Sequence, residues 1–226
     1  MKKLVLFDVC KTLVNTNSTK EYICFLDSNN IWNKIYSRIL KNRYLSILLY
    51  LINKYLNIDL SRELVFSFFK WISISNEDKL SKKFFNQYIL KKTKIMDILI
   101  KYKKNKSYDI YLVSASINQP IDLLANHLWV WSFSTRLIVE NNKYTWHVYH
   151  DLLWDKEYAL KNSDINMRGY DECFLYTDDI SDFSLIKFLK LSTNHLKIFP
   201  IINNRINEKK RRKFLSNNKI DYEFIF

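Results

Sequence analysis

The chain contains a single glycine, Gly169, among its 226 residues, whereas glycine makes up about 7% of an average protein. An α/β protein normally places glycine in its tight turns, so other residues must form the turns here. The three cysteines, Cys10, Cys24 and Cys173, are odd in number and show no CxxC spacing. This count excludes a disulfide scaffold and favours free thiols in a reducing compartment.

Long apolar runs are also missing. The apolar stretch after Met1-Lys2-Lys3 is too short for a secretory signal, and the run from Tyr44 to Leu51 is too short to span a bilayer. We therefore expect a cytoplasmic protein. A peripheral membrane contact through the broad apolar face of residues 33–56 stays open as an alternative.

The net charge of +13 points to an anionic partner. However, the basic residues are spread along the chain, and no nucleic-acid recognition motif accompanies them. The densest cluster, Lys209–Lys213, fits either a solvated helix face or a contact with a polyanion. Nucleic acid is therefore the least favoured partner.

Hydrophobic residues make up 48% of the chain, which indicates a globular protein. Its first apolar run, Lys3–Phe7, reads as a strand buried on both faces in the middle of a parallel sheet. Asp8 follows directly. Ligands of open parallel sheets bind beyond the carboxyl ends of the strands, so Asp8 is placed for chemistry. A helix N-cap or a solvated turn carboxylate is the structural alternative.

A second acidic strand end occurs late in the chain. The predicted strand Cys173–Tyr176 runs into Thr177, Asp178 and Asp182, and an apolar helix follows. Carboxylates clustered at one strand end repel one another, and a hard divalent cation with oxygen ligands relieves this repulsion. A polar acidic loop without metal is the alternative.

Two further segments carry polar or charged groups that can bind an anion. The predicted strand Asp109–Val113 ends in Ser114-Ala115-Ser116, where a hydroxyl and helix-starting amides can bind an anion, or a serine can simply cap a helix. Lys156 opens a predicted helix. A lone lysine in such a place is usually exposed to solvent.

The order of predicted helices and strands indicates a helical insertion after the first strand, followed by the rest of the α/β core. Residues 15–91 read as helices, and the later residues read as strands with intervening helices. The predicted helices of the insertion are Glu21–Leu26, Trp32–Leu56, Leu60–Trp71 and Glu77–Leu90. The other predicted elements are the helix Thr93–Lys104, the hairpin strands Ser134–Glu140 and Tyr144–Tyr149, the strand Leu196–Pro200, the helix Asn207–Leu215 and a final segment Tyr222–Phe224.

Taken in order, the four segments around Asp8, Ser114, Lys156 and Asp178 resemble the motifs of the haloacid dehalogenase-like hydrolase superfamily, in its phosphoserine phosphatase-like branch. The resemblance covers essentially the whole chain, with the insertion matched only in type. It implies an α/β fold with a Rossmann-like core, in which helices flank a central parallel sheet, plus a small inserted α-helical cap. The core would comprise residues 1–14 and 92–226, and the cap residues 15–91.

The resemblance also implies a role for each matching residue. Asp8 would be the nucleophile, and Lys156 would pair with it. Thr12, Ser114, Ala115 and Lys156 would bind the substrate phosphate. Magnesium would be held at Asp8, Asp178, Asp182 and the main-chain carbonyl of Cys10, with Asp182 orienting the metal shell.

One position departs from the family pattern, because Cys10 stands where the family has its acid/base aspartate. We therefore expect a magnesium-dependent phosphatase that acts on a small phosphorylated metabolite through an aspartyl-phosphate, with activity reduced by Cys10. Two alternatives stay open: a lipid-phosphate phosphatase, suggested by the basic and apolar cap, and a non-catalytic phosphate-binding member.

The resemblance bears on the missing glycines too. Trp146 and Trp154 stand where similar proteins have glycine, in the hairpin and just before the lysine-bearing helix. We hypothesise that some of the six tryptophans are UGA codons that the source organism reads as glycine.

Overall fold

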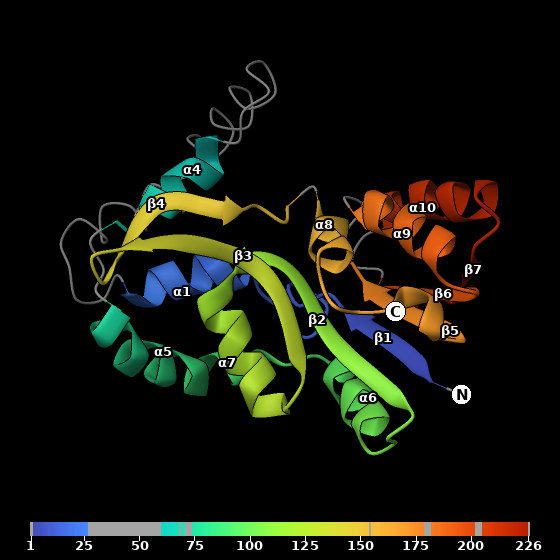
Figure 1. The fold of residues 1–226 in the computed structure, drawn as a ribbon, viewed down its shortest axis with the longest axis horizontal. Coiled ribbons are helices and arrows are strands. Elements are labelled where there is room, and N and C mark those ends of the chain that lie inside the picture. The colour runs from blue at the N-terminus through green and yellow to red at the C-terminus, as the bar shows by residue number, and fades with distance from the viewer. Residues whose placement is uncertain are drawn as a thin grey trace.

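The computed structural model describes residues 2–26, 60–67, 69–70, 74–153, 155–178, 182–201 and 205–225. Within these ranges the chain forms one seven-stranded sheet with helices on both faces (Figure 1). The strand order is β4-β3-β2-β1-β5-β6-β7, which places β1 in the middle. The strands are β1 (Lys3–Phe7), β2 (Tyr108–Ile117), β3 (Trp131–Glu140), β4 (Lys143–His150), β5 (Glu172–Thr177), β6 (His195–Pro200) and β7 (Asp221–Tyr222).

The sheet is parallel except at one edge. β1 pairs in parallel with both β2 and β5, so that Leu6 lies opposite Tyr111 on one side and Leu175 on the other. Only the pairing of β3 with β4 is antiparallel among the described strands. The predicted α/β fold with a central parallel sheet is confirmed.

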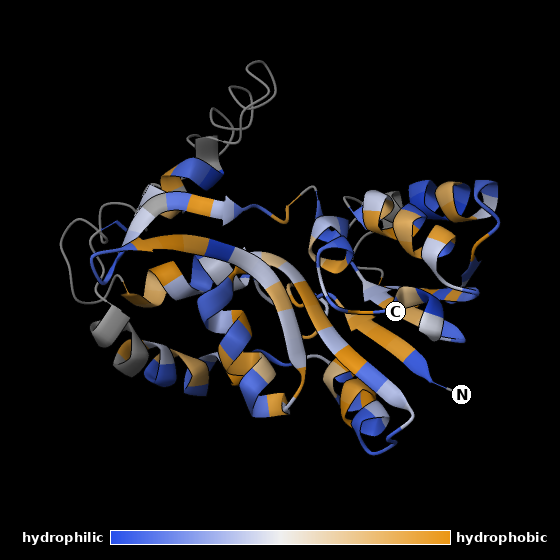
Figure 2. Ribbon diagram, in the orientation of Figure 1, coloured by the Kyte–Doolittle hydropathy of each residue, from blue (hydrophilic) through white to orange (hydrophobic). Residues whose placement is uncertain are grey.

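Side chains of β1 alternate between two apolar cores. Leu4 and Leu6 face one core, and Val5 and Phe7 face the other, all fully buried. The Val5 core is completed by α6 (Lys94–Lys103), α7 (Asn118–Leu128) and helices of the insertion. The helices that pack against the Leu4 core are α8 (Lys156–Lys161), α9 (Phe183–Ser192) and α10 (Arg205–Asn217). Figure 2 shows the apolar character of β1 between these layers. Burial on both faces explains why this strand has no polar alternation.

Helices of the insertion lie between β1 and β2 in sequence. Those in the described ranges are α1 (Ser18–Leu26), α4 (Leu60–Ser67), α5 (Ile74–Tyr88) and the short 3₁₀ helix η2 (Ile89–Lys91). α1 packs on α5 and α7, with the rings of Tyr22 and Phe84 edge to face at 5.0 Å, and α4 packs on β4 (Figure 1). The predicted helices at 21–26, 60–71 and 77–90 are confirmed in type, although α4 ends earlier and α5 begins earlier. The predicted helix Trp32–Leu56 lies outside the described residues.

The predicted hairpin is confirmed as β3 and β4. Its turn contains Asn141 and Asn142, whose φ angles of 50° and 60° are both positive. A two-residue turn of this type requires positive φ at both positions, and asparagine tolerates it better than most residues. β3 begins at Trp131, three residues before the predicted start, because it continues the parallel pairing with β2.

Several backbone positions that favour glycine carry other residues. Trp129 ends α7 in the left-handed conformation, with φ 54° and ψ 48°, and its side chain is 85% exposed. Trp146 lies where β4 bulges, since three residues separate Tyr144 from Val148 opposite a single residue of β3. A left-handed helix end and a bulge are both places where glycine is common. They support the recoding hypothesis at these two positions, whereas Trp154 lies outside the described residues.

None of the helices within the described ranges is long and apolar enough to cross a membrane. Residues 33–56, the proposed membrane-contacting face, lie wholly outside those ranges. The basic cluster Lys209–Lys213 falls on α10, where Arg211 is buried and donates to the Ile201 carbonyl. Arg212 pairs with Glu208 one turn away. Part of the cluster therefore serves the fold of its own helix.

Candidate active site

Asp8 lies at the carboxyl end of the central strand. It follows Phe7 directly, is 5% exposed, and donates its backbone N–H to the Tyr176 carbonyl at 2.9 Å. Since β1, β2 and β5 run in parallel, the residues that end these strands meet at one edge of the sheet. Thr12, fully buried in the turn after β1, lies with its hydroxyl 3.5 Å from Asp8 Oδ2.

Lys156 joins two carboxylates from distant parts of the chain. It begins α8, it is only 4% exposed, and its Nζ lies 3.0 Å from Asp8 Oδ1 and 2.7 Å from Asp182 Oδ1. Burial alone would lower the pKa of Lys156, but the charges of Asp182 and Asp8 raise it above its usual value. The lysine is therefore a permanently charged, buried bridge and does not face solvent.

Asp182 immediately precedes α9 and is 1% exposed. One of its carboxylate oxygens pairs with Lys156, and the other accepts a hydrogen bond from the hydroxyl of Thr177, the last residue of β5. Both oxygens are thus held by the protein. Asp178 follows β5, and its charge acts on Asp8.

The electrostatic balance of this cluster is negative. Burial raises the pKa of Asp8 to about 8; Lys156 opposes the shift, while the charges of Asp182 and Asp178 add to it. With all three carboxyl groups ionised, the single ammonium of Lys156 leaves two formal negative charges. A buried cluster of this kind attracts a cation.

Cys10 contacts two serines rather than a carboxylate. Its Sγ lies 3.0 Å from Ser116 Oγ and 3.2 Å from Ser18 Oγ, and it accepts a hydrogen bond from the Ser18 N–H at 3.3 Å. Burial raises the pKa of the Cys10 thiol, with a further contribution from the charge of Asp8. The thiol thus ties the start of α1 to the end of β2.

The Ser-Ala-Ser segment belongs to a strand. β2 extends to Ile117, so Ser114 and Ser116 are strand residues and the N-cap of α7 is Ile117. Ser114 is 1% exposed, and its Oγ accepts from the Ser116 N–H at 3.2 Å. The helix-cap alternative for these serines is therefore wrong.

Comparison with known protein families assigns the chain to one of them. The model of the haloacid dehalogenase-like hydrolase family matches residues 5–187, a range that includes Asp8, Cys10, Ser114, Lys156 and Asp182. The protein belongs to this family. No curated protein sequence matches it significantly.

Solved structures share the fold of this hydrolase at low sequence identity. A protein of unknown function from Bordetella pertussis Tohama I is 15% identical with a TM-score of 0.75, and the match covers 98% of each chain. A substrate-bound phosphoserine phosphatase complex is 20% identical with a TM-score of 0.57, covering 96% of this chain and 98% of that one. Cytosolic 5′-nucleotidase IIIB bound to cytidine is 9% identical with a TM-score of 0.59, covering 94% and 78% respectively.

The predicted site residues come together in part. The structure joins Asp8, Thr12, Lys156 and Asp182 through direct contacts. The negative charge of Asp178 raises the pKa of Asp8. Residues 179–181 lie outside the described ranges. Within those ranges no three histidine, cysteine, aspartate or glutamate side chains form a cluster suited to a metal ion. The expected magnesium ligands are two carboxylates and one main-chain carbonyl, so they do not require a group of three such side chains.

Arg62 lies near the end of β2, although the sequence does not indicate it as a site residue. This residue of α4 has a side chain only 15% exposed, and its guanidinium pairs with Asp151 and donates to the Ala115 carbonyl. No motif marks it, because arginine on an amphipathic helix usually faces solvent. It brings a charged group of the insertion to the end of β2.

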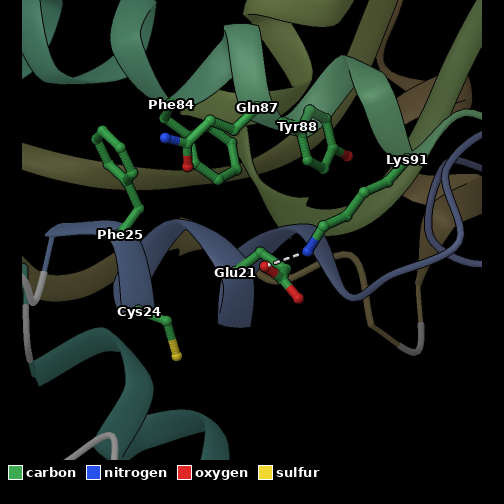
Figure 3. A pocket seen from close by; sticks show the side chains of 7 residues that line it. All are labelled: Glu21, Cys24, Phe25, Phe84, Gln87, Tyr88 and Lys91. Atoms are coloured by element: carbon green, nitrogen blue, oxygen red, sulfur yellow. Dashed lines mark hydrogen bonds and ion pairs between the residues drawn. The ribbon is translucent and has the colours of Figure 1, made fainter.

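A cavity of about 380 Å³ lies between α1 and α5 (Figure 3). The Glu21–Lys91 ion pair stands on one side, at 2.7 Å, and Tyr88 forms part of the wall. The Tyr88 hydroxyl shares a hydrogen bond with Ser18 Oγ, which in turn contacts Cys10. A chain of polar groups therefore runs from Cys10 to the cavity wall.

Proposed function

We propose that this haloacid dehalogenase-like hydrolase is a magnesium-dependent phosphatase that acts on the phosphate monoester of a small metabolite through an aspartyl-phosphate intermediate. The observation that carries the proposal is the buried Lys156, which pairs with both Asp8 and Asp182 at the carboxyl end of the central strand. An ordinary surface lysine would not be held between two buried carboxylates. Family membership supports the same chemistry.

The residues present fit a divalent cation. Asp8 and Asp178, with the main-chain carbonyl of Cys10, would hold magnesium by oxygen atoms, the ligands it prefers. Asp182 has both oxygens in contact with Lys156 and Thr177, so it would orient the site rather than coordinate directly. When bound, magnesium neutralises phosphate charge and aligns the phosphoryl group for attack.

The chain's own residues would divide the remaining work. An oxygen of the ionised Asp8 carboxylate would attack phosphorus while the bond to the leaving oxygen breaks, and the leaving oxygen would take up a proton from water. A second water would then hydrolyse the aspartyl-phosphate, which releases phosphate and restores the carboxylate of Asp8. Lys156, Thr12, Ser114 and the amide of Ala115 would bind the phosphoryl oxygens. Lys156 is already fixed beside the nucleophile, so it needs no reorganisation at the moment of reaction.

The identity of residue 10 affects the turnover rate that we expect. The family's acid/base carboxyl is replaced by a thiol that contacts Ser18 and Ser116. General acid/base catalysis typically contributes about 10²–10⁴-fold, so we expect turnover slower than that of relatives with an aspartate here. Complete loss of turnover with phosphate binding retained is the second candidate function, a non-catalytic module, and Cys10 is the observation that favours it.

The inserted helices are proposed as a cap. We assign residues 15–91 to the cap and residues 1–14 and 92–226 to the core. Contacts from α1 and α4 to the end of β2 support this division, since they bring the insertion to the edge of the sheet where Asp8 lies. Such a cap would exclude water and select the leaving group.

Phosphate release from a panel of small monoesters tests the proposal. We expect release that requires magnesium, disappears with a chelator, and is abolished by Asp8→Asn. Asp122→Asn is the matched control, because Asp122 lies on α7 and accepts hydrogen bonds from Asn118 of α7 and Ser132 of β3 rather than pairing with Lys156. Magnesium-dependent phosphate binding without release would identify the non-catalytic module, and release that survives Asp8→Asn would refute the mechanism.

A further inference from the structure

Arg62 and Asp151 form an ion pair between the insertion and the core. The Nε and Nη2 atoms of Arg62, on α4, both contact the carboxylate of Asp151, which follows β4. The two side chains are 15% and 32% exposed, so the pair is mostly shielded from water. A two-point contact of a guanidinium with a carboxylate fixes the plane of the guanidinium as well as its distance.

The oriented guanidinium reaches the backbone of β2. Its Nη2, whose other contact is Asp151, donates to the Ala115 carbonyl and lies 3.1 Å from Thr135 Oγ1. Thr135 is fully buried, and its hydroxyl lies 3.0 Å from the same carbonyl. The Ala115 carbonyl is thus held by one group from the insertion and one from β3.

The Ala115 carbonyl and the Ser116 N–H belong to the same peptide group. A peptide group is planar and rigid, so fixing the direction of the carbonyl also fixes the direction of the N–H. That N–H donates to Ser114 Oγ at 3.2 Å. Because Ser114 Oγ accepts this bond, its own hydrogen is directed elsewhere, where it can donate to a phosphoryl oxygen.

We propose that Arg62 and Asp151 are positioning residues that orient the Ser114 hydroxyl through the Ala115–Ser116 peptide group. This inference rests on the proposed phosphatase function. The pair makes the hydroxyl's orientation depend on the seating of α4 against the core, so the phosphate site is complete only when the insertion is docked. Arg62 acts through the peptide group and does not itself contact the phosphate.

Epistasis with Ser114 is the decisive test, with p-nitrophenyl phosphate as the probe in the presence of magnesium. We expect Arg62→Met to lower kcat/KM by about 10–100-fold, the scale of a catalytic group displaced by an ångström. In a Ser114→Ala background the same change should cost less than about threefold, since the group it orients is gone. Arg62→Lys keeps one donor and should recover part of the loss.

Two further variants separate positioning from other roles. Asp151→Asn should lower kcat/KM in the same direction as Arg62→Met, and the double variant should be no worse than Arg62→Met alone. Lys197→Met is the control, because Lys197 lies on β6, three strands from β2 in the sheet, and pairs with Glu223 at 2.8 Å. It should change kcat/KM less than twofold. Equal losses from Arg62→Met with and without Ser114 would overturn the proposal, as would activity unaffected by Asp151→Asn.

Amide hydrogen exchange tests the pair independently of turnover. In the otherwise unaltered chain, Arg62→Met should speed exchange of the Ser116 amide relative to the wild type, while Lys197→Met should not. Unchanged exchange would refute the positioning role even in an active enzyme. If the wild type releases no phosphate, the proposed function fails, and the exchange result still decides whether Arg62 orders this peptide group.

Discussion

Replacing Lys156 by methionine tests the buried bridge most sharply in terms of stability. The substitution keeps the length of the side chain but removes the ammonium between Asp8 and Asp182, which are 6% and 1% exposed at their side chains. Breaking a buried ion pair by removing one partner typically costs about 3–5 kcal/mol. At about 2–4 °C per kcal/mol for a chain of this size, Tm should fall by about 6–20 °C.

The cost should depend on pH in a definite direction. Without Lys156 the pKa of Asp8 rises further above its unfolded value, because the opposing charge of Lys156 is gone, so the folded variant binds a proton more tightly than the unfolded chain. Its stability therefore declines as pH rises, and its deficit relative to the wild type grows from pH 5 to pH 8. Lys156 itself stays charged over this range in the wild type, because its pKa is raised.

Urea unfolding in the presence of a chelator, at pH 5 and at pH 8, measures this difference. Lys197→Met removes an exposed ion pair and should cost less than about 1 kcal/mol at either pH. Adding Asp182→Asn to Lys156→Met should recover part of the loss, because one uncompensated charge disappears. A deficit below about 1 kcal/mol at pH 8, or the same deficit at both pH values, would refute the buried bridge.

Three further outcomes follow from the described contacts. The pKa of Asp8 is raised to about 8 from 3.8. The free energy of unfolding of the metal-free protein should therefore fall as pH rises from about 4 to about 8, by up to ~1.4 kcal/mol per pH unit. Urea unfolding of Asp8→Asn should show a flatter pH dependence. Cys10→Asp should raise kcat by about 10²-fold, since Ser18 and Ser116 already offer donors to a carboxylate there; an unchanged kcat would place proton transfer elsewhere. Trp129→Gly should stabilise the protein by about 1 kcal/mol by relieving the left-handed backbone, and peptide mass analysis from the source organism should find glycine at 129 if the codon is recoded.

The location of the motifs in the fold could be predicted from the sequence, because parallel strands place their carboxyl ends at one edge of the sheet. Once Lys3–Phe7 is read as a central strand, the ends of its parallel neighbours must lie beside Asp8, which brings Ser114 and Asp178 to the same edge. Lys156 had no local signal, since a lysine at the start of a helix looks like any exposed lysine. Only its order among the motifs indicated a buried role.

Some contacts could not be predicted from the sequence, because they join residues far apart in the chain that belong to no recognisable motif. Arg62 meets Asp151 across 89 positions and Thr135 across 73, and nothing in the local composition marks the three as partners. The Ser-Ala-Ser segment was ambiguous because a strand end and a helix N-cap both favour serine. Its extension of β2 is decided by pairing with β3, a contact that no local pattern reveals.

Transfer of labelled phosphate to the protein tests the central claim most directly. A single turnover of a phosphate-labelled monoester with magnesium, stopped by acid, should leave label on the peptide that contains Asp8, and Asp8→Asn should carry none. Phosphate released without any labelled protein would mean that water attacks the substrate directly and would contradict a nucleophilic Asp8.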